Sequence, residues 1–78
     1  MNITKNQTKT TKVAHRLGRR IQKMRKATGL TQEDLAEKIN TSWTWVAHIE
    51  TGRETPNLKM LQKIARALRV KVKDLIPY

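Results

Sequence analysis

A chain of 78 residues, of which 37% are apolar, forms at most one small domain, and its core leaves no room for a deep substrate cavity. It contains no cysteine, so neither a disulfide framework nor a thiolate zinc site can supplement that core. The 17 lysines and arginines outnumber the 6 acidic residues and give a net charge of +11, which predicts attraction to nucleic acid or to an anionic membrane surface.

The first twelve residues differ in composition from the rest of the chain. They are almost entirely Thr, Lys, Asn and Gln, and they cannot bury enough apolar surface to offset the loss of chain entropy. We therefore predict a flexible basic arm over residues 1–12 and a single domain over residues 13–78. From Val13, apolar residues recur at Leu17, Ile21 and Met24, the spacing of one helical stripe. This pattern predicts a basic amphipathic helix that ends near Gly29.

A second helix is predicted to start after Thr31. Thr31 can cap its N-terminus, and Asp34 lies at the third helical position, where a negative charge is favourable. Leu35, Ala36 and Ile39 supply the apolar face. Asn40 stands where this helix must end, because Asn tolerates the left-handed conformation of a residue just past a helix end.

Three further helices are predicted in the rest of the chain. Ser42 can cap the third helix, Val46 and Ile49 form its inward pair, and Gly52 is a left-handed stop. Asn57 can cap a fourth helix, whose apolar stripe is Leu58, Leu61, Ile64, Ala65 and Leu68. A short fifth helix is expected from about residue 71 up to Pro77. No alternating strand pattern competes, so the predicted fold class is all-α with five helices.

The stretch LTQEDLAEKINTSWTWVAHIETGRETPNLKMLQKIARALRVKVKDL resembles the helix-turn-helix domain of the phage Cro and repressor proteins. The resemblance covers roughly residues 13 to 76, and it implies a compact, five-helix, lambda-repressor-like fold. The residue types agree with such a turn on physical grounds. Ala36 is small where the two motif helices cross, Asn40 turns the chain, and Val46 with Ile49 seats the second motif helix on the core.

The resemblance implies that the helix from about Ser42 to Thr51 enters the major groove of double-stranded DNA, as in a small stand-alone transcriptional regulator. By position, it nominates as base-contacting residues Ser42, Trp43, Thr44, Ala47 and His48. As phosphate-contacting residues we predict Gln32, Thr31, Arg53, Arg19, Lys23 and Trp45. In the family the glutamine matched by Gln32 also braces the first recognition residue. Trp43 departs from the family pattern, because an indole has one donor and no acceptor and cannot read a base edge in a bidentate manner.

Trp43 and Trp45 are two positions apart, so they lie on nearly opposite sides of a helix. With Val46 and Ile49 on the buried side, we expect Trp43 to face the groove and Trp45 to be a partly buried plug at the flank. Contact of Trp43 with a protein partner is the alternative. Arg25 and Glu50 match a family pair that links the first helix to the end of the recognition helix, so we predict a structural salt bridge.

Two other function classes fit parts of the sequence. A membrane-surface or single-stranded RNA binder would use the basic first helix, but that helix lacks the apolar excess of an interfacial helix. A protein-interaction module, such as an antitoxin or adaptor, would use exposed tryptophans. An enzyme is not expected, and the sequence suggests no cofactor or small-molecule ligand. No metal site is expected either, because His15 and His48 are few and far apart in the sequence. Without a membrane-spanning run or a signal peptide, a cytoplasmic protein is expected, and a homodimer is possible.

Overall fold

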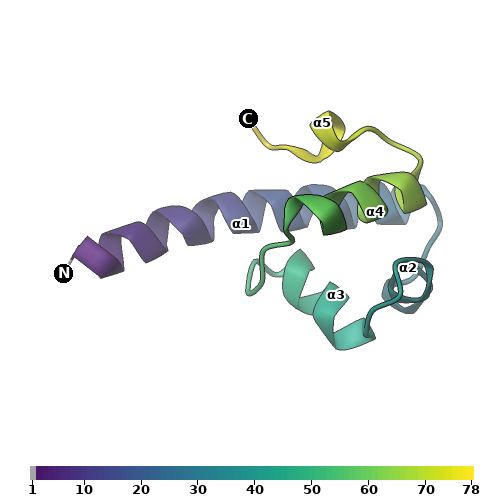
Figure 1. Ribbon diagram of the computed structural model, residues 1–78, viewed down its shortest axis with the longest axis horizontal. Coiled ribbons are helices and arrows are strands. Elements are labelled where there is room, and N and C mark those ends of the chain that lie inside the picture. The colour runs from purple at the N-terminus through teal and green to yellow at the C-terminus, as the bar shows by residue number, and fades with distance from the viewer. Residues whose placement is uncertain (1) are drawn as a thin grey trace.

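A computed structural model describes residues 2 to 78 of the chain, with side chains described from Lys12 onward. It contains the helices α1 (Asn2–Ala27), α2 (Gln32–Lys38), α3 (Trp43–Glu50), α4 (Leu58–Leu68) and α5 (Val72–Leu75). In Figure 1, α1 and α4 separate the α2–α3 pair on one side from α5 on the other. The predicted all-α fold class with five helices is confirmed.

The first helix is longer than the sequence predicts. α1 begins at Asn2 rather than near Val13, so the backbone of the predicted arm is helical from residue 2 onward. No proline or glycine interrupts residues 2 to 12, and the helical hydrogen bonding of α1 can therefore continue through them. The side chains of residues 1 to 11 lie outside the described residues, so the division into an arm and a domain stays a prediction.

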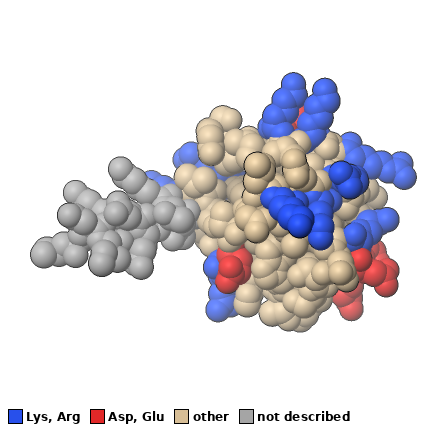
Figure 2. All heavy atoms as spheres, in the orientation of Figure 1, with Lys and Arg blue, Asp and Glu red and all other residues tan. Residues whose placement is uncertain are grey.

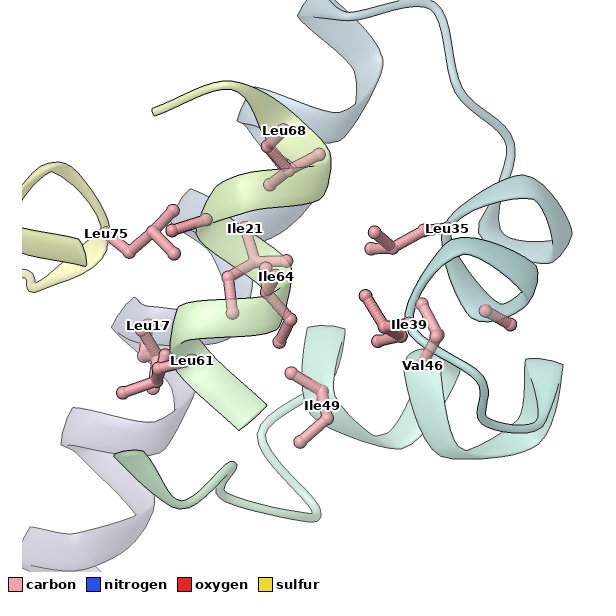
Figure 3. Close-up of a cluster of buried hydrophobic side chains, with 12 residues drawn as sticks. Leu17, Ile21, Leu35, Ile39, Val46, Ile49, Leu61, Ile64, Leu68 and Leu75 are labelled. Atoms are coloured by element: carbon pink, nitrogen blue, oxygen red, sulfur yellow. The ribbon is translucent and has the colours of Figure 1, made fainter. Parts of the chain in front are cut away.

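The core is assembled from one apolar stripe on each helix (Figure 3). The side chains that are almost fully buried are Ile21, Leu35, Ile39, Val46, Ile49, Ile64 and Leu75. The prediction that Val13 and Leu58 belong to the buried stripes is wrong, because Val13 is 44% exposed and Leu58 is 66% exposed. Leu58 is the first residue of α4, where the helix starts beyond the edge of the core, and on α1 Ala14 is buried in place of Val13.

Helix ends in this fold depend on residues with positive φ. Asn40 has φ of 57°, which confirms the left-handed conformation predicted for it, and Gly52 has φ of 79°. The sequence analysis missed a further such position, Arg69, with φ of 60°. There the backbone N–H of Val70 donates to the carbonyl of Ala65 at 2.9 Å, which satisfies the end of α4 at the cost of a strained arginine.

The strain at Arg69 leads to a first prediction. Arg69→Gly is expected to raise the free energy of unfolding by about 0.5 kcal/mol, because relief of the left-handed strain exceeds the entropic cost of glycine. Urea denaturation of the variant measures this change. Arg66→Gly is the matched control, since Arg66 is an exposed arginine inside the same helix, and it should cost about 1 kcal/mol. Equal losses in both variants would contradict the assignment of strain to Arg69.

Candidate nucleic-acid interface

The start of α2 is fixed by a reciprocal pair of hydrogen bonds. The backbone N–H of Asp34 donates to the Thr31 hydroxyl at 3.0 Å, and the backbone N–H of Thr31 donates to the Asp34 carboxylate at 2.9 Å. Hydrogen bonding to Thr31 lowers the pKa of Asp34 below its ordinary value. The bond from the Thr31 backbone has the larger effect, and the interaction with the Thr31 side chain adds to it. The ionised carboxylate therefore stays beside the positive end of α2, as the sequence predicts.

The turn between α2 and α3 has the geometry that the sequence predicts. After α2, the N–H of Asn40 donates to the carbonyl of Glu37 at 3.2 Å, and the N–H of Thr41 donates to the carbonyl of Ala36 at 2.9 Å. The Ser42 hydroxyl then accepts from the N–H of Trp45 at 3.1 Å and caps α3. These local bonds satisfy both helix ends within a few residues, and the two helices pack closely with Ala36 buried between them.

The side chains of α3 divide into a buried and an exposed side. Val46 and Ile49 are each only 1% exposed and seat the helix on the core. Thr44 is exposed, and Ala47 and His48 are partly exposed. Since positions 44, 47 and 48 lie on the opposite side of the helix from 46 and 49, they form the surface that α3 offers to a partner.

The two tryptophans occupy different environments. Trp43, the first residue of α3, is 54% exposed, whereas Trp45 is half-buried and packs against the core cluster. This separation is the one that helical spacing predicts. Apart from the buried Glu50, α3 contains no Asp, Glu, Lys or Arg, and Figure 2 shows few of these residues at the bottom of the molecule, where α3 lies.

The end of α3 is held by the predicted ion pair. Arg25 Nε lies 2.6 Å from Glu50 Oε2 and its second terminal nitrogen lies 3.1 Å from Glu50 Oε1, so the pair is bidentate. The remaining terminal nitrogen of Arg25 donates to the carbonyl of Leu30 at 2.7 Å. Both residues are buried, and each buried charge is therefore both paired and hydrogen-bonded.

The family resemblance implies that Gln32 braces the first recognition residue, but the structure shows a different contact. Its amide nitrogen donates to Glu50 Oε1 at 2.9 Å, so it supports the last residue of α3 instead. The reason is spatial, because the start of α2 lies beside the end of α3. One amide hydrogen of Gln32 remains for another acceptor.

A glycine that the sequence analysis did not single out sets the distance between α1 and α3. A Cβ atom on Gly18 would lie 2.2 Å from the carbonyl oxygen of Ile49 and 2.8 Å from that of Glu50. Only a residue without a side chain allows this approach. The available signal was a glycine inside an otherwise regular helical stripe, which often marks close backbone contact.

The predicted cationic contacts are divided between two places. Arg53 is exposed in the loop after α3, close to the predicted recognition surface. Arg19 and Lys23 are exposed on α1, where they line a groove that also includes Pro77, beyond the end of α5. The structure therefore places Gln32 against the end of α3 and Arg53 in the loop that follows it, and it places Arg19 and Lys23 in the groove beside Pro77.

Neither a metal centre nor a membrane span is found in the part of the chain that the structure describes. Among those residues, no three His, Cys, Asp or Glu side chains are grouped so that they could hold a metal ion. No helix there is both long and apolar enough to cross a membrane.

Comparison with known families gives a match over most of the chain. The model of a family described as a helix-turn-helix domain matches residues 16–76, which include α2, the turn and α3. The chain belongs to this helix-turn-helix family. The resemblance to phage repressors is confirmed by the immunity repressor protein of Bacillus phage phi105, which is 42% identical over 77% of this chain and 42% of its own length.

Other relatives of this helix-turn-helix domain are eukaryotic. Endothelial differentiation-related factor 1 of Homo sapiens is 44% identical, over 80% of this chain and 42% of the relative. Multiprotein-bridging factor 1 of Debaryomyces hansenii is 42% identical, over 82% of this chain and 43% of the relative. The chain thus spans about two fifths of the length of these relatives.

Solved structures share the fold. The restriction-modification controller protein C.AhdI from Aeromonas hydrophila superposes with a TM-score of 0.77 at 31% identity, over 80% of this chain and 94% of that one. The clp gene regulator ClgR from Corynebacterium glutamicum gives a TM-score of 0.80 at 26% identity, over 82% of each chain. The chain has the repressor-like fold of helix-turn-helix transcription regulators.

Proposed function

We propose that the chain binds double-stranded DNA in a sequence-specific manner as a transcriptional regulator, with α3 in the major groove. The observation that supports this proposal most strongly is how α3 is packed on the core. The helix is fixed to the core through Val46, Ile49 and the Arg25–Glu50 pair, while its opposite side stays exposed and carries no Asp, Glu, Lys or Arg. A rigid helix with one free side is what reading of base edges requires.

The residues divide by the chemistry that each offers. Base contacts are assigned to Ser42, Trp43, Thr44, Ala47 and His48. The threonine hydroxyl can bond to several base edges, and the alanine methyl and the indole can contact a thymine methyl. Phosphate contacts are assigned to Thr31, Gln32, Trp45 and Arg53, which lie at the start of α2, at the flank of α3 and in the following loop.

We further propose that the domain acts as a homodimer on DNA. One α3 reads a half-site, and two-fold symmetry joins two half-sites into an operator. The half-buried Ile76 and the 91% exposed Tyr78 are the apolar groups that the C-terminal end offers to a second copy.

A second candidate function is favoured by the exposure of Trp43. A large aromatic side chain that is 54% exposed is also what a protein-binding site presents. The name of one relative, multiprotein-bridging factor 1, points the same way. In this alternative α3 contacts a protein partner in place of bases.

The tryptophans distinguish the two functions. Trp43→Ala is expected to leave the melting temperature nearly unchanged and to weaken specific DNA binding by about 1 to 3 kcal/mol, the range for one lost base contact. Trp45→Ala is the matched variant. It removes a half-buried side chain, so it should cost about 2 kcal/mol of stability and weaken binding only through a looser α3.

The experiment first selects bound sites from a random duplex pool. Both variants are then titrated against the selected duplex and a scrambled duplex at one salt concentration, with thermal melts in parallel. Failure of the parent to enrich any sequence would refute sequence-specific binding. Tight binding of the selected duplex by Trp43→Ala would instead assign Trp43 to a protein partner.

A further inference from the structure

The outer side of α1 carries a dense group of cations that the proposed recognition surface does not include. A groove of about 550 Å³ is lined by Arg16, Arg19, Arg20, Lys23 and Lys26 together with Gln22 and Pro77, and we call it the α1 groove. No acidic side chain lines it. Five cations on one helix, without interspersed acids, repel one another and favour an anionic ligand.

The α1 groove lies on a different side of the molecule from the open side of α3. Arg20 Nε donates to the backbone carbonyl of Asp74, in α5, at 2.8 Å, and Pro77 follows α5 directly. Figure 1 shows α5 and α3 on opposite sides of the α1–α4 layer. Gly18, which contacts the end of α3, lies about 100° around α1 from Arg19. The α1 groove therefore extends toward α5, across the α1–α4 layer from α3.

The spacing of the cations fits an extended polyanion. Lys26 follows Arg16 by ten positions, so the charges extend over about 15 Å along the helix axis. The side chains at positions 16, 19, 23 and 26 recur every three to four residues and form one continuous row. Arginine prefers phosphate and carboxylate groups, because its planar fork donates two parallel hydrogen bonds.

The chemistry of the lining favours a nucleic-acid backbone over an acidic peptide. Peptide sites depend on apolar or aromatic anchors that fill pockets, and Pro77 is the one apolar residue in the lining of this groove. The lining also holds no aromatic side chain on which a base could stack. A phosphodiester backbone needs neither anchors nor stacking, since its binding comes from charge neutralisation and counterion release.

We propose that the α1 groove binds the phosphodiester backbone of a nucleic acid at a site separate from α3. One domain then holds two nucleic-acid segments, or one segment at α1 while α3 contacts another partner. This assigns the predicted phosphate contacts of Arg19 and Lys23 to the α1 groove instead of to the duplex read by α3. Binding at the groove does not depend on whether α3 reads bases.

The test uses the full chain labelled with ¹⁵N and follows backbone amide signals during titration. Three probes are used separately, namely a random-sequence duplex DNA, a single-stranded RNA and a polyglutamate peptide. The groove variant is Arg19→Gln, Lys23→Gln and Lys26→Gln together. The control variant, Lys59→Gln, Arg69→Gln and Lys73→Gln, removes the same charge from exposed positions on α4, α5 and their connection. Thermal melts check that both variants fold, and the single change Lys23→Glu replaces the triple variant if it does not.

We expect DNA or RNA to shift the amide signals of residues 16 to 26, and the nucleic acid that does so identifies the source of the backbone. The groove variant should lose about tenfold or more in affinity at that site, with the control variant's affinity and the α3 signals little changed.

Equal weakening by the control variant would overturn the proposal in favour of diffuse attraction. If the groove variant lost the ligand-induced shifts of both α1 and α3, a single duplex would contact both helices, and the proposal of a separate site would be overturned. Binding of polyglutamate but of neither nucleic acid would show a peptide site. Loss of α3 shifts alone would count against the proposed function and leave the groove intact.

Discussion

Gly18→Ala is expected to lower the free energy of unfolding by about 3 kcal/mol, because the added methyl group meets backbone atoms that cannot rotate away. The new Cβ would lie 2.2 Å from the carbonyl oxygen of Ile49, so α1 and the end of α3 must move apart. Overpacking usually costs about 1 to 3 kcal/mol and more where the backbone has to shift. The better helix propensity of alanine, about 1 kcal/mol, offsets only part of this cost.

Chemical denaturation of Gly18→Ala against Arg19→Ala measures the effect. Arg19 is the next residue of the same helix and is exposed, so its replacement should change stability by less than about 0.5 kcal/mol. If Gly18→Ala were as stable to denaturant as the parent, or more stable, the close crossing of α1 and α3 would be refuted. Where the variant does fold, we expect weaker DNA binding, because α3 is displaced from its seat.

Glu50→Ala is expected to cost about 3 to 4 kcal/mol of stability. The Glu50 side chain is 1% exposed, and its removal leaves the guanidinium of Arg25 buried without its counter-charge. The amide of Gln32 also loses its acceptor. These losses follow from burial, since an exposed ion pair would contribute less than about 1 kcal/mol.

Glu54→Ala is the matched control, because Glu54 is an exposed acid four residues further along the chain, and it should change stability by less than about 0.5 kcal/mol. A double variant, Arg25→Met with Glu50→Leu, separates charge from packing. It should recover much of the loss, because a buried ion pair can be replaced by apolar side chains of similar size. Recovery should be incomplete, since the carbonyl of Leu30 loses its donor. A loss as small for Glu50→Ala as for Glu54→Ala would contradict the burial of the pair.

The turn of the motif could be predicted because its signals are local. Thr31, Asn40 and Ser42 each make their capping contacts within a few residues, so their types and spacing indicate the helix ends directly. The same locality accounts for the opposite environments of Trp43 and Trp45, which follow from helical spacing once Val46 and Ile49 are placed inward.

Other features required the positions of whole helices. Arg69 resembles any other surface arginine in the sequence, yet the path from α4 to α5 holds it in the left-handed region. Leu58 fits the apolar stripe of α4 but lies at a helix start that the core does not reach. The target of Gln32 depended on which residue of α3 lies beside the start of α2.

By itself, therefore, the sequence determined the helical class, the N-caps of α2, α3 and α4, the turn and, apart from Val13 and Leu58, the inward side of the helices, because hydrogen bonds and apolar periodicity within one helix depend on near neighbours. Only the tertiary structure decided the need for glycine at position 18, the bracing of Glu50 by Gln32, and the separation of the α1 groove from α3. These depend on the distances and angles at which helices cross, and those are set by contacts between residues far apart in the chain.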